Sequence, residues 1–159
     1  MKVVLMLSVR FSSLPGLVKD FPDVTFEQVN APEEMAAALP GAEILMITNR
    51  LYTPGIAKVV ADVGKELRWI QFATSGIDKA IKNGLPDGMP VTNVSGIHGP
   101  VISEHVMHLL LGLFRRTREV EQARIEGKWI RDEISPKIRV LDGATLVVVG
   151  QGSIGRAVA

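Results

Sequence analysis

Short apolar, β-branched runs alternate with helix-length segments along much of this 159-residue chain, and this alternation restricts the fold more than any other feature. A strand, a helix and a further strand form a right-handed unit, and a series of such units builds a parallel sheet. We therefore predict an α/β fold with a doubly wound parallel sheet. The predicted strands cover residues 3–7, 24–29, 44–48, 69–72 and 91–94.

Signals for helix starts mark the segments between these strands. A proline or a threonine cap at the start and acidic residues in the first turn favour a helix. They predict helices over residues 14–21, 30–39 and 53–63. A longer helix is predicted to begin at Gly99-Pro100, because apolar residues follow at helical spacing as far as Phe114.

The charge balance and the residue content exclude several kinds of partner. The formal net charge is +1, so there is no general attraction to nucleic acid or to acidic membranes. No apolar run approaches the ~18 residues that a membrane span needs. The chain has no cysteine, which excludes thiolate metal sites and fits a cytoplasmic protein.

Three arginines toward the later part of the long helix are interpreted as a solvated face: Arg115, Arg116 and Arg118.

A glycine-rich turn follows one further apolar run. Residues 144–149 are interpreted as a buried parallel strand that leads into the turn GQGSIG at residues 150–155 and the start of a helix. In a G-x-G-x-x-G turn of this kind, the glycines permit a tight turn, close approach of a pyrophosphate and close packing of helix and strand. The acidic residue expected to hold the ribose falls beyond Ala159, so the sequence does not distinguish NAD from NADP.

Ligands of open α/β sheets bind beyond the carboxyl ends of the strands, which brings two further loops into consideration. Residues 73–78 follow the fourth predicted strand, and their small residues can expose successive backbone N–H groups that bind an anion. On local sequence alone, an ordinary strand-to-helix turn with Asp78 near the N-cap is the simpler interpretation. The loop after the fifth strand carries His98, which is interpreted as incidental.

Two histidines on the long helix raise the question of a metal site. His105 and His108 lie three residues apart, but no third ligand is evident and the HExxH order is absent. Glu104 lies in the first turn of that helix, where a carboxylate suits the helix dipole. We therefore predict no metal site.

Three blocks of the sequence resemble, in the right order, the D-isomer-specific 2-hydroxyacid dehydrogenases. They are FATSGID at residues 72–78, VTNVSGIHGPVISEHVMHLLLGLFRR at residues 91–116, and the stretch from GKWIR to GQGSIGRAVA at residues 127–159. The resemblance implies a flavodoxin-like substrate domain, a linking helix and the first strand, turn and helix of a Rossmann domain. The implied bounds are 1–98 for the substrate domain, 99–126 for the hinge and its helix, and 127–159 for a dimer-arm-like connection and the start of the NAD(P)-binding domain.

The family interconverts 2-keto acids and D-2-hydroxy acids by hydride transfer with NAD(P), so the resemblance implies this activity. It implies that backbone N–H groups of Thr74, Ser75 and Gly76 hold the carboxylate of a small 2-keto or 2-hydroxy acid. The implied contacts to the cofactor pyrophosphate come from Gly152, Ser153 and Ile154, with Gly150 and Gly155 shaping the turn.

The resemblance also implies a homodimer, with the segment around Trp129 in an arm that makes the dimer contact. The family's acid/base histidine, its carboxylate partner and its arginine have no counterpart here. We therefore assign no catalytic residue and expect this chain by itself to be an incomplete and inactive portion of such an enzyme. Gly99-Pro100 stands where many members carry a hydroxyl or acidic pair, so no cofactor contact is assigned to that loop.

Two alternatives remain open. In the first, the chain is a non-catalytic binding or assembly module that associates through the apolar run at residues 144–149 and the long helix. In the second, it is part of another two-domain dehydrogenase class, such as the folate-linked or homocysteine-linked enzymes. The order of the three blocks disfavours the second alternative.

Overall fold

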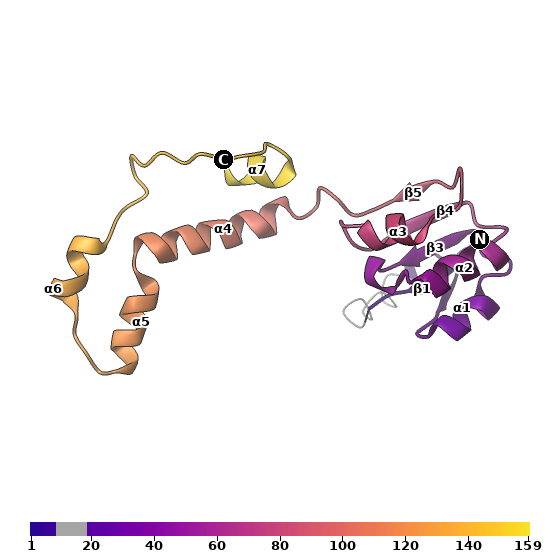
Figure 1. Ribbon diagram of the computed structural model, residues 1–159, viewed down its shortest axis with the longest axis horizontal. Helices are drawn as coiled ribbons and strands as arrows, with labels where there is room; N and C mark the ends of the chain where they lie inside the picture. The colour runs from indigo at the N-terminus through magenta and orange to yellow at the C-terminus, as the bar shows by residue number, and fades with distance from the viewer. Residues whose placement is uncertain (9–18) are drawn as a thin grey trace. The chain divides into compact units, whose positions relative to one another are not determined.

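The computed structural model describes residues 1–8 and 19–159, and these form two compact units, Met1–Ser95 and Gly96–Ala159 (Figure 1). The helix predicted over residues 14–21 falls mostly on residues 9–18, which lie outside the described part of the chain. None of the described helices has the length and apolar character needed to cross a bilayer.

The first unit is built on a five-stranded sheet in which every pair of neighbouring strands is parallel. The strand order is β2-β1-β3-β4-β5, which is the flavodoxin-like order. The predicted parallel α/β sheet is therefore confirmed. The strands are β1 (Lys2–Met6), β2 (Thr25–Gln28), β3 (Ile44–Ile47), β4 (Trp69–Phe72) and β5 (Val91–Thr92).

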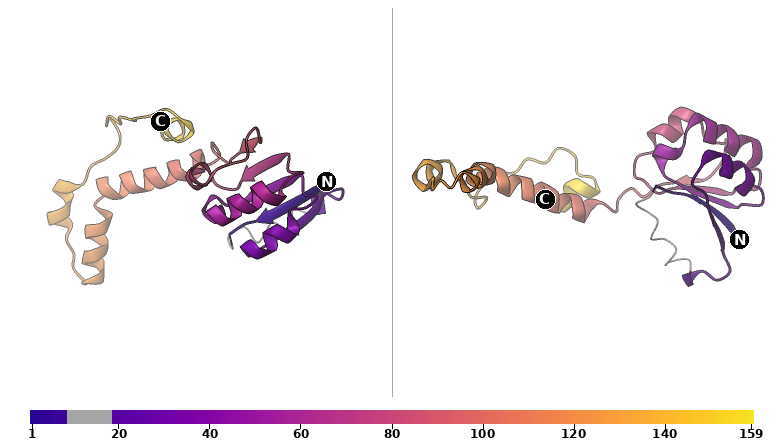
Figure 2. Two further views of the ribbon diagram at one scale, coloured as in Figure 1. Left: turned by 45° about the vertical axis from the view of Figure 1, so that its right-hand side comes forward. Right: turned by 90° about the horizontal axis from the view of Figure 1, so that it is seen from below.

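Three α-helices lie together on one side of this sheet (Figure 2). The connections from β2 to β3, from β3 to β4 and from β4 to β5 all run in the same direction across the sheet. Because such connections are right-handed, their helices lie on the same face. Thr53 starts the second helix as predicted, because its Oγ1 accepts a hydrogen bond from the N–H of Ile56 at 3.3 Å. The helical segments are α1 (Pro32–Ala38), the 3₁₀ turn η3 (Asn49–Leu51), α2 (Pro54–Val63) and α3 (Asp78–Asn83).

The main core lies between these helices and the sheet. Alternate strand residues such as Leu45 and Ile70 are fully buried against α1, α2 and α3. Tyr52 packs edge-on against Phe72 with ring centroids 5.6 Å apart, and its hydroxyl donates to the carbonyl oxygen of Gly84 at 3.1 Å. Burial raises the pKa of the Tyr52 hydroxyl above its ordinary value, so this side chain acts as a neutral donor.

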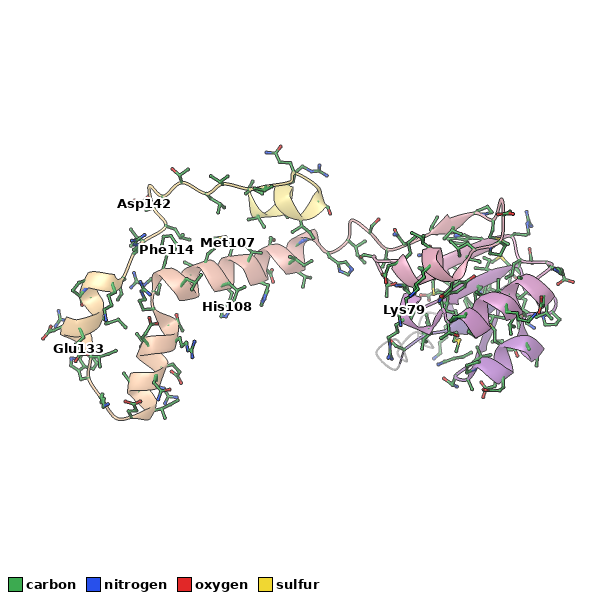
Figure 3. All side chains as sticks on the ribbon, viewed as in Figure 1. Lys79, Met107, His108, Phe114, Glu133 and Asp142 are labelled. Carbon is green, nitrogen blue, oxygen red and sulfur yellow. The ribbon has the colours of Figure 1, made fainter. Side chains whose placement is uncertain are left out.

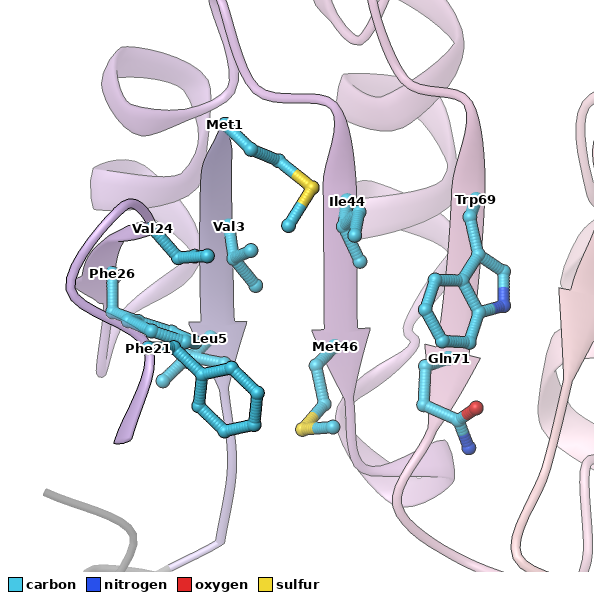
Figure 4. Close-up of a pocket in the computed structure, with 10 residues that line it drawn as sticks. All are labelled: Met1, Val3, Leu5, Phe21, Val24, Phe26, Ile44, Met46, Trp69 and Gln71. Atoms are coloured by element: carbon cyan, nitrogen blue, oxygen red, sulfur yellow. The ribbon is translucent and has the colours of Figure 1, made fainter. Parts of the chain in front are cut away.

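The opposite face of the sheet is also apolar (Figure 4). Within residues 1–8 and 19–95, none of the α-helices packs on this face. Parallel sheets bury both faces, so strands with apolar residues on each side suit this topology. The side chains that line this face are Met1, Val3, Leu5, Phe21, Val24, Phe26, Ile44, Met46, Trp69 and Gln71.

The second unit begins with the predicted long helix, but this helix ends before the three arginines that were assigned to its later part. The helix α4 runs from Gly99 to Phe114, Arg116 adopts a left-handed conformation with φ 54°, and a second helix then begins. Nε of Arg116 donates to the carbonyl oxygen of Lys137 at 3.3 Å, which ties this break to the returning chain. Arg115, Arg116 and Arg118 all lie beyond Phe114, so the interpretation that they belong to the later part of the long helix is wrong. The remaining elements are α5 (Thr117–Ile125), α6 (Arg131–Ile134), the 3₁₀ turn η4 (Ser135–Lys137) and α7 (Ser153–Val158).

The prediction of a buried strand over residues 144–149 is also wrong. This segment pairs with none of the described strands, and the side chains of Val147 and Val149 are 79% and 97% exposed. An apolar, β-branched run supplies the propensity for a strand, but a strand forms only where a neighbouring strand accepts and donates its backbone hydrogen bonds.

We expect the core position Ile70 to dominate the stability of the first unit. Replacement of fully buried Ile70 by alanine leaves a cavity, so we expect the free energy of unfolding to fall by about 3 kcal/mol. The matched control is Ile81→Ala in α3, where the side chain is 68% exposed and the expected change is within about 0.5 kcal/mol. Urea denaturation followed by circular dichroism measures both, and equal losses for the two variants would contradict this account of the core.

Candidate functional site

The loop between β4 and α3 lies at the carboxyl edge of the sheet, where β3 and β5 also end. Its centre is formed by Thr74, Ser75 and Gly76, the residues that the sequence resemblance places at the substrate. Thr74 and Ser75 are half-buried and Gly76 is exposed. The loop is thus open to solvent at its tip and anchored at its base.

On one side, the segment that follows β5 anchors the loop through three hydrogen bonds. The N–H of Val94 donates to the carbonyl oxygen of Thr74 at 3.4 Å. Nδ2 of Asn93 donates to the carbonyl oxygen of Ser75 at 2.8 Å. Oγ of Ser75 donates in return to the carbonyl oxygen of Val94 at 3.3 Å. These bonds fix the positions of two successive peptide groups of the loop.

On the other side, Asn49 at the end of β3 connects the loop to α3. Its backbone N–H donates to Oγ1 of Thr74 at 3.4 Å, and that hydroxyl donates to the carbonyl oxygen of Gly76 at 2.9 Å. The buried Asn49 side chain donates to Oδ1 of Asp78 at 3.0 Å and accepts from the N–H of Ala80 at 3.1 Å. Asp78 is the first residue of α3 rather than its N-cap. Its carboxylate accepts the hydrogen bond from the Asn49 side chain.

The loop leaves a row of backbone donors available. Among residues 1–8 and 19–159, no acceptor takes a hydrogen bond from the N–H groups of Thr74, Ser75 or Gly76. Successive free N–H groups form a concave site for an anion, and a carboxylate fits such a site without a cationic side chain. The geometry of the loop therefore permits the carboxylate contact that the sequence resemblance implies.

The glycine-rich turn at residues 150–155 belongs to the second unit, and its glycines have distinct steric situations. Gly150 has φ 94°, a conformation that favours glycine. A Cβ atom on Gly155 would overlap the carbonyl oxygen of Gly150 and lie 3.3 Å from Cγ1 of Val148. Gly152 has no atom within 4 Å of such a position, so the space beside it is open to a ligand.

The start of α7 completes this turn. No acceptor in the described part of the chain takes a hydrogen bond from the N–H groups of Gly152, Ser153 or Ile154. Free N–H groups at this position suit a phosphate. The helix α7 packs against the start of α4, where a Cβ atom on Gly99 would lie 3.1 Å from the carbonyl oxygen of Ser153. The absence of a side chain at Gly99 therefore permits close packing beneath the turn.

The histidines do not form a catalytic or metal-binding group in the part of the chain that the structure describes. His98 lies in the exposed turn before α4. The ring centroids of His105 and His108 in α4 are 6.4 Å apart. His108 is labelled on this helix in Figure 3. No group of three potential metal ligands occurs among the described residues, and none of their histidines bonds a carboxylate. We therefore assign neither a metal site nor an acid/base pair here.

Comparison of the structure with solved structures finds similar proteins, whereas comparison of the sequence with family models and curated proteins finds no match. No family model matches the chain, and no curated protein matches it. The structure of a D-isomer-specific 2-hydroxyacid dehydrogenase family protein from Aeromonas salmonicida covers 99% of this chain with a TM-score of 0.80 and 23% identity. D-lactate dehydrogenase from Aquifex aeolicus, complexed with NAD and lactic acid, covers 98% with a TM-score of 0.72 and 22% identity. An acyclic imino acid reductase in complex with NADPH and D-Arg covers 99% with a TM-score of 0.64 and 16% identity.

The parallel sheet and these neighbours first define the class of the fold, which is an α/β fold built on a parallel sheet. More particularly, the chain has the fold of the D-isomer-specific 2-hydroxyacid dehydrogenases, and the resemblance seen in the sequence is confirmed at this level. The chain spans about half the length of these neighbours, with coverage of 48%, 46% and 51% of their chains.

We expect Asn49 to be required for the stability of the loop and of α3. Replacement of Asn49 by alanine leaves the buried N–H of Ala80 without an acceptor, so the free energy of unfolding should fall by about 2 kcal/mol. The control is Lys79→Ala, which changes an exposed side chain in the same helix and should cost less than about 0.5 kcal/mol. Urea denaturation measures both variants, and a loss for Asn49→Ala no larger than that of the control would contradict the assigned role.

Proposed function

We propose that this chain supplies the substrate loop and the pyrophosphate turn of an NAD(P)-dependent oxidoreductase of the D-2-hydroxyacid dehydrogenase family. The proposed reaction interconverts 2-keto acids and D-2-hydroxy acids by hydride transfer. The observation that carries the proposal is a row of N–H groups at residues 74–76 that no acceptor within residues 1–8 and 19–159 occupies. The row lies at the carboxyl edge of a parallel sheet in a fold of these dehydrogenases.

The proposed substrate is a small 2-keto or 2-hydroxy acid. Its carboxylate would accept hydrogen bonds from the N–H groups of Thr74, Ser75 and Gly76. The carbonyl oxygens of this loop are already bonded to Asn93, Val94 and the Thr74 hydroxyl, which leaves the N–H groups to the ligand. The Aquifex aeolicus neighbour was crystallised with lactic acid, a ligand of this chemical class.

The proposed cofactor is NAD or NADP, which supplies or accepts the hydride when it is bound. The residues of the turn fit a pyrophosphate, because Gly152 leaves open space and the first N–H groups of α7 are free within the described chain. Neighbours bound to NAD and to NADPH both occur, so the choice between the two stays open. The proposed contact residues are Gly150, Gly152, Ser153, Ile154 and Gly155.

We also propose that the enzyme is a cytoplasmic homodimer with three segments of distinct role. Residues 1–98 would bind substrate, 99–126 would form the hinge and its helix, and 127–159 would form an arm and the start of the NAD(P)-binding domain. Trp129 in this arm is 88% exposed, and a large apolar side chain in that position suits an interface with a second copy. The lack of cysteine suits a reducing compartment.

A non-catalytic assembly module is the second candidate function. The helix α4 is apolar around most of its surface, and Val101 and Leu113 on it are 69% and 70% exposed. A helix that is apolar on all sides is normally buried. The exposed run at residues 144–149 offers a further unpaired surface. These features support association with another chain, which both candidate functions require.

We expect the N–H groups of residues 74–76 to bind a 2-keto acid. Addition of pyruvate to the ¹⁵N-labelled chain should shift the amide signals of Thr74, Ser75 and Gly76 more than those elsewhere in the first unit, because these donors meet the carboxylate. Pyruvamide, which keeps the keto group and lacks the charge, is the ligand control. Equal shifts with both ligands, or none with pyruvate, would remove the basis for the proposed substrate site.

We expect the 159-residue chain by itself to oxidise no NADH with pyruvate or with 2-ketoisocaproate. The reason is that the acid/base histidine, its carboxylate partner and the arginine implied by the family resemblance have no counterpart in this sequence, and these groups would protonate and polarise the carbonyl as hydride arrives. Absorbance at the NADH band, compared with a blank without protein, measures the rate. Turnover above this blank would show that the chain is catalytically sufficient.

A further inference from the structure

We infer that Asn93 is a positioning residue that aims the N–H groups of the substrate loop at the bound anion. This inference rests on the proposed function of the loop and adds to it a residue outside residues 74–76. The family resemblance assigns no role to Asn93, and its function is argued here from its contacts alone.

The first step is the orientation of a single peptide group. Nδ2 of Asn93 donates to the carbonyl oxygen of Ser75 at 2.8 Å. The described chain contains no cis peptide, and in a trans peptide the carbonyl and the next N–H point in opposite directions. A Ser75 carbonyl held toward Asn93 therefore directs the N–H of Gly76 away from Asn93.

The second step concerns the preceding peptide group. The carbonyl oxygen of Thr74 accepts from the N–H of Val94 at 3.4 Å, so the N–H of Ser75 points away from Val94. Asn93 and Val94 are neighbours on one segment, so the two carbonyls face the same side. The N–H groups of Ser75 and Gly76 consequently lie together on the opposite side, which is the arrangement that binds an anion.

The third step is that the Asn93 amide can be placed in only one way. Its Oδ1 accepts two hydrogen bonds from Ser95, from the backbone N–H at 3.2 Å and from Oγ at 2.8 Å. The oxygen must face the N–H donor, so the amino group faces the Ser75 carbonyl. An aspartate in place of Asn93 would keep the bonds to Ser95 and would turn a second oxygen toward that carbonyl.

The test uses three variants of the 159-residue chain. Asn93→Ala removes the anchor, and Asn93→Asp keeps the shape but replaces the donor with an acceptor. Thr92→Ala is the matched control on the preceding residue, because the Thr92 hydroxyl accepts a hydrogen bond from Trp69 and donates one to Gln71, both on β4. The readouts are the NMR order parameter of the Gly76 N–H in the free protein, the Kd for pyruvate from amide shifts, and urea unfolding.

We expect Asn93→Ala to lower the Gly76 order parameter from about 0.85 to below about 0.6 and to leave that of Ala80 unchanged. The Kd for pyruvate should rise about tenfold, roughly the net effect of one hydrogen bond. Asn93→Asp should weaken binding at least as much, and Thr92→Ala should change neither quantity. Unfolding in urea shows whether each variant is folded.

Two results would overturn the inference. One is an unchanged Gly76 order parameter in folded Asn93→Ala, and the other is a Kd for pyruvate within about twofold of the wild type. If the wild-type chain binds no pyruvate, the proposed function of the loop fails, and the order parameter in the free protein still decides whether Asn93 holds the Gly76 N–H.

Discussion

The parallel pairing of β3, β4 and β5 is the constraint on which the candidate substrate site depends. Parallel strands end at the same edge of a sheet, so the residues that follow the three strands meet there although they are far apart in sequence. Asn49, the loop at residues 74–76 and Asn93 come together for this reason. An antiparallel pairing of the same strands would send alternate loops to opposite edges and would separate these groups.

The alternation of apolar runs and helices was sufficient to predict the sheet. The small residues after β4 brought the loop into consideration, but only the family resemblance favoured a ligand site there over an ordinary strand-to-helix turn. Asn49 and Asn93 were not predicted, because their partners lie across neighbouring strands and no local pattern marks such contacts. The only available signal is an asparagine within two residues of the end of a strand at the carboxyl edge. The side chain of an asparagine can satisfy one donor and one acceptor at once, which suits it to connect two backbone segments.

The errors in the second unit have a related cause. The apolar run at residues 144–149 has the composition of a strand, but strand formation depends on a partner that composition does not reveal. The break at Arg116 interrupts a region of continuous helical character, and the Arg116 side chain there donates to the carbonyl oxygen of Lys137, twenty-one residues away. In both places the local conformation depends on contacts, made at Arg116 and missing at residues 144–149, that local composition does not show, so propensity alone gives the wrong result.

Both candidate ligand sites are formed by backbone N–H groups, but different physical means hold these groups in place. At residues 150–155 the arrangement depends on the absence of side chains, because a Cβ atom on Gly155 would overlap the carbonyl oxygen of Gly150. At residues 74–76 it depends on donors that hold the carbonyl oxygens: the Asn93 side chain, the backbone N–H of Val94 and the hydroxyl of Thr74. The first kind of site is visible in the sequence as a glycine motif. The second kind has no motif of its own, because Asn93 and Val94 come from the segment after another strand, and only the three-dimensional structure brings them to the loop.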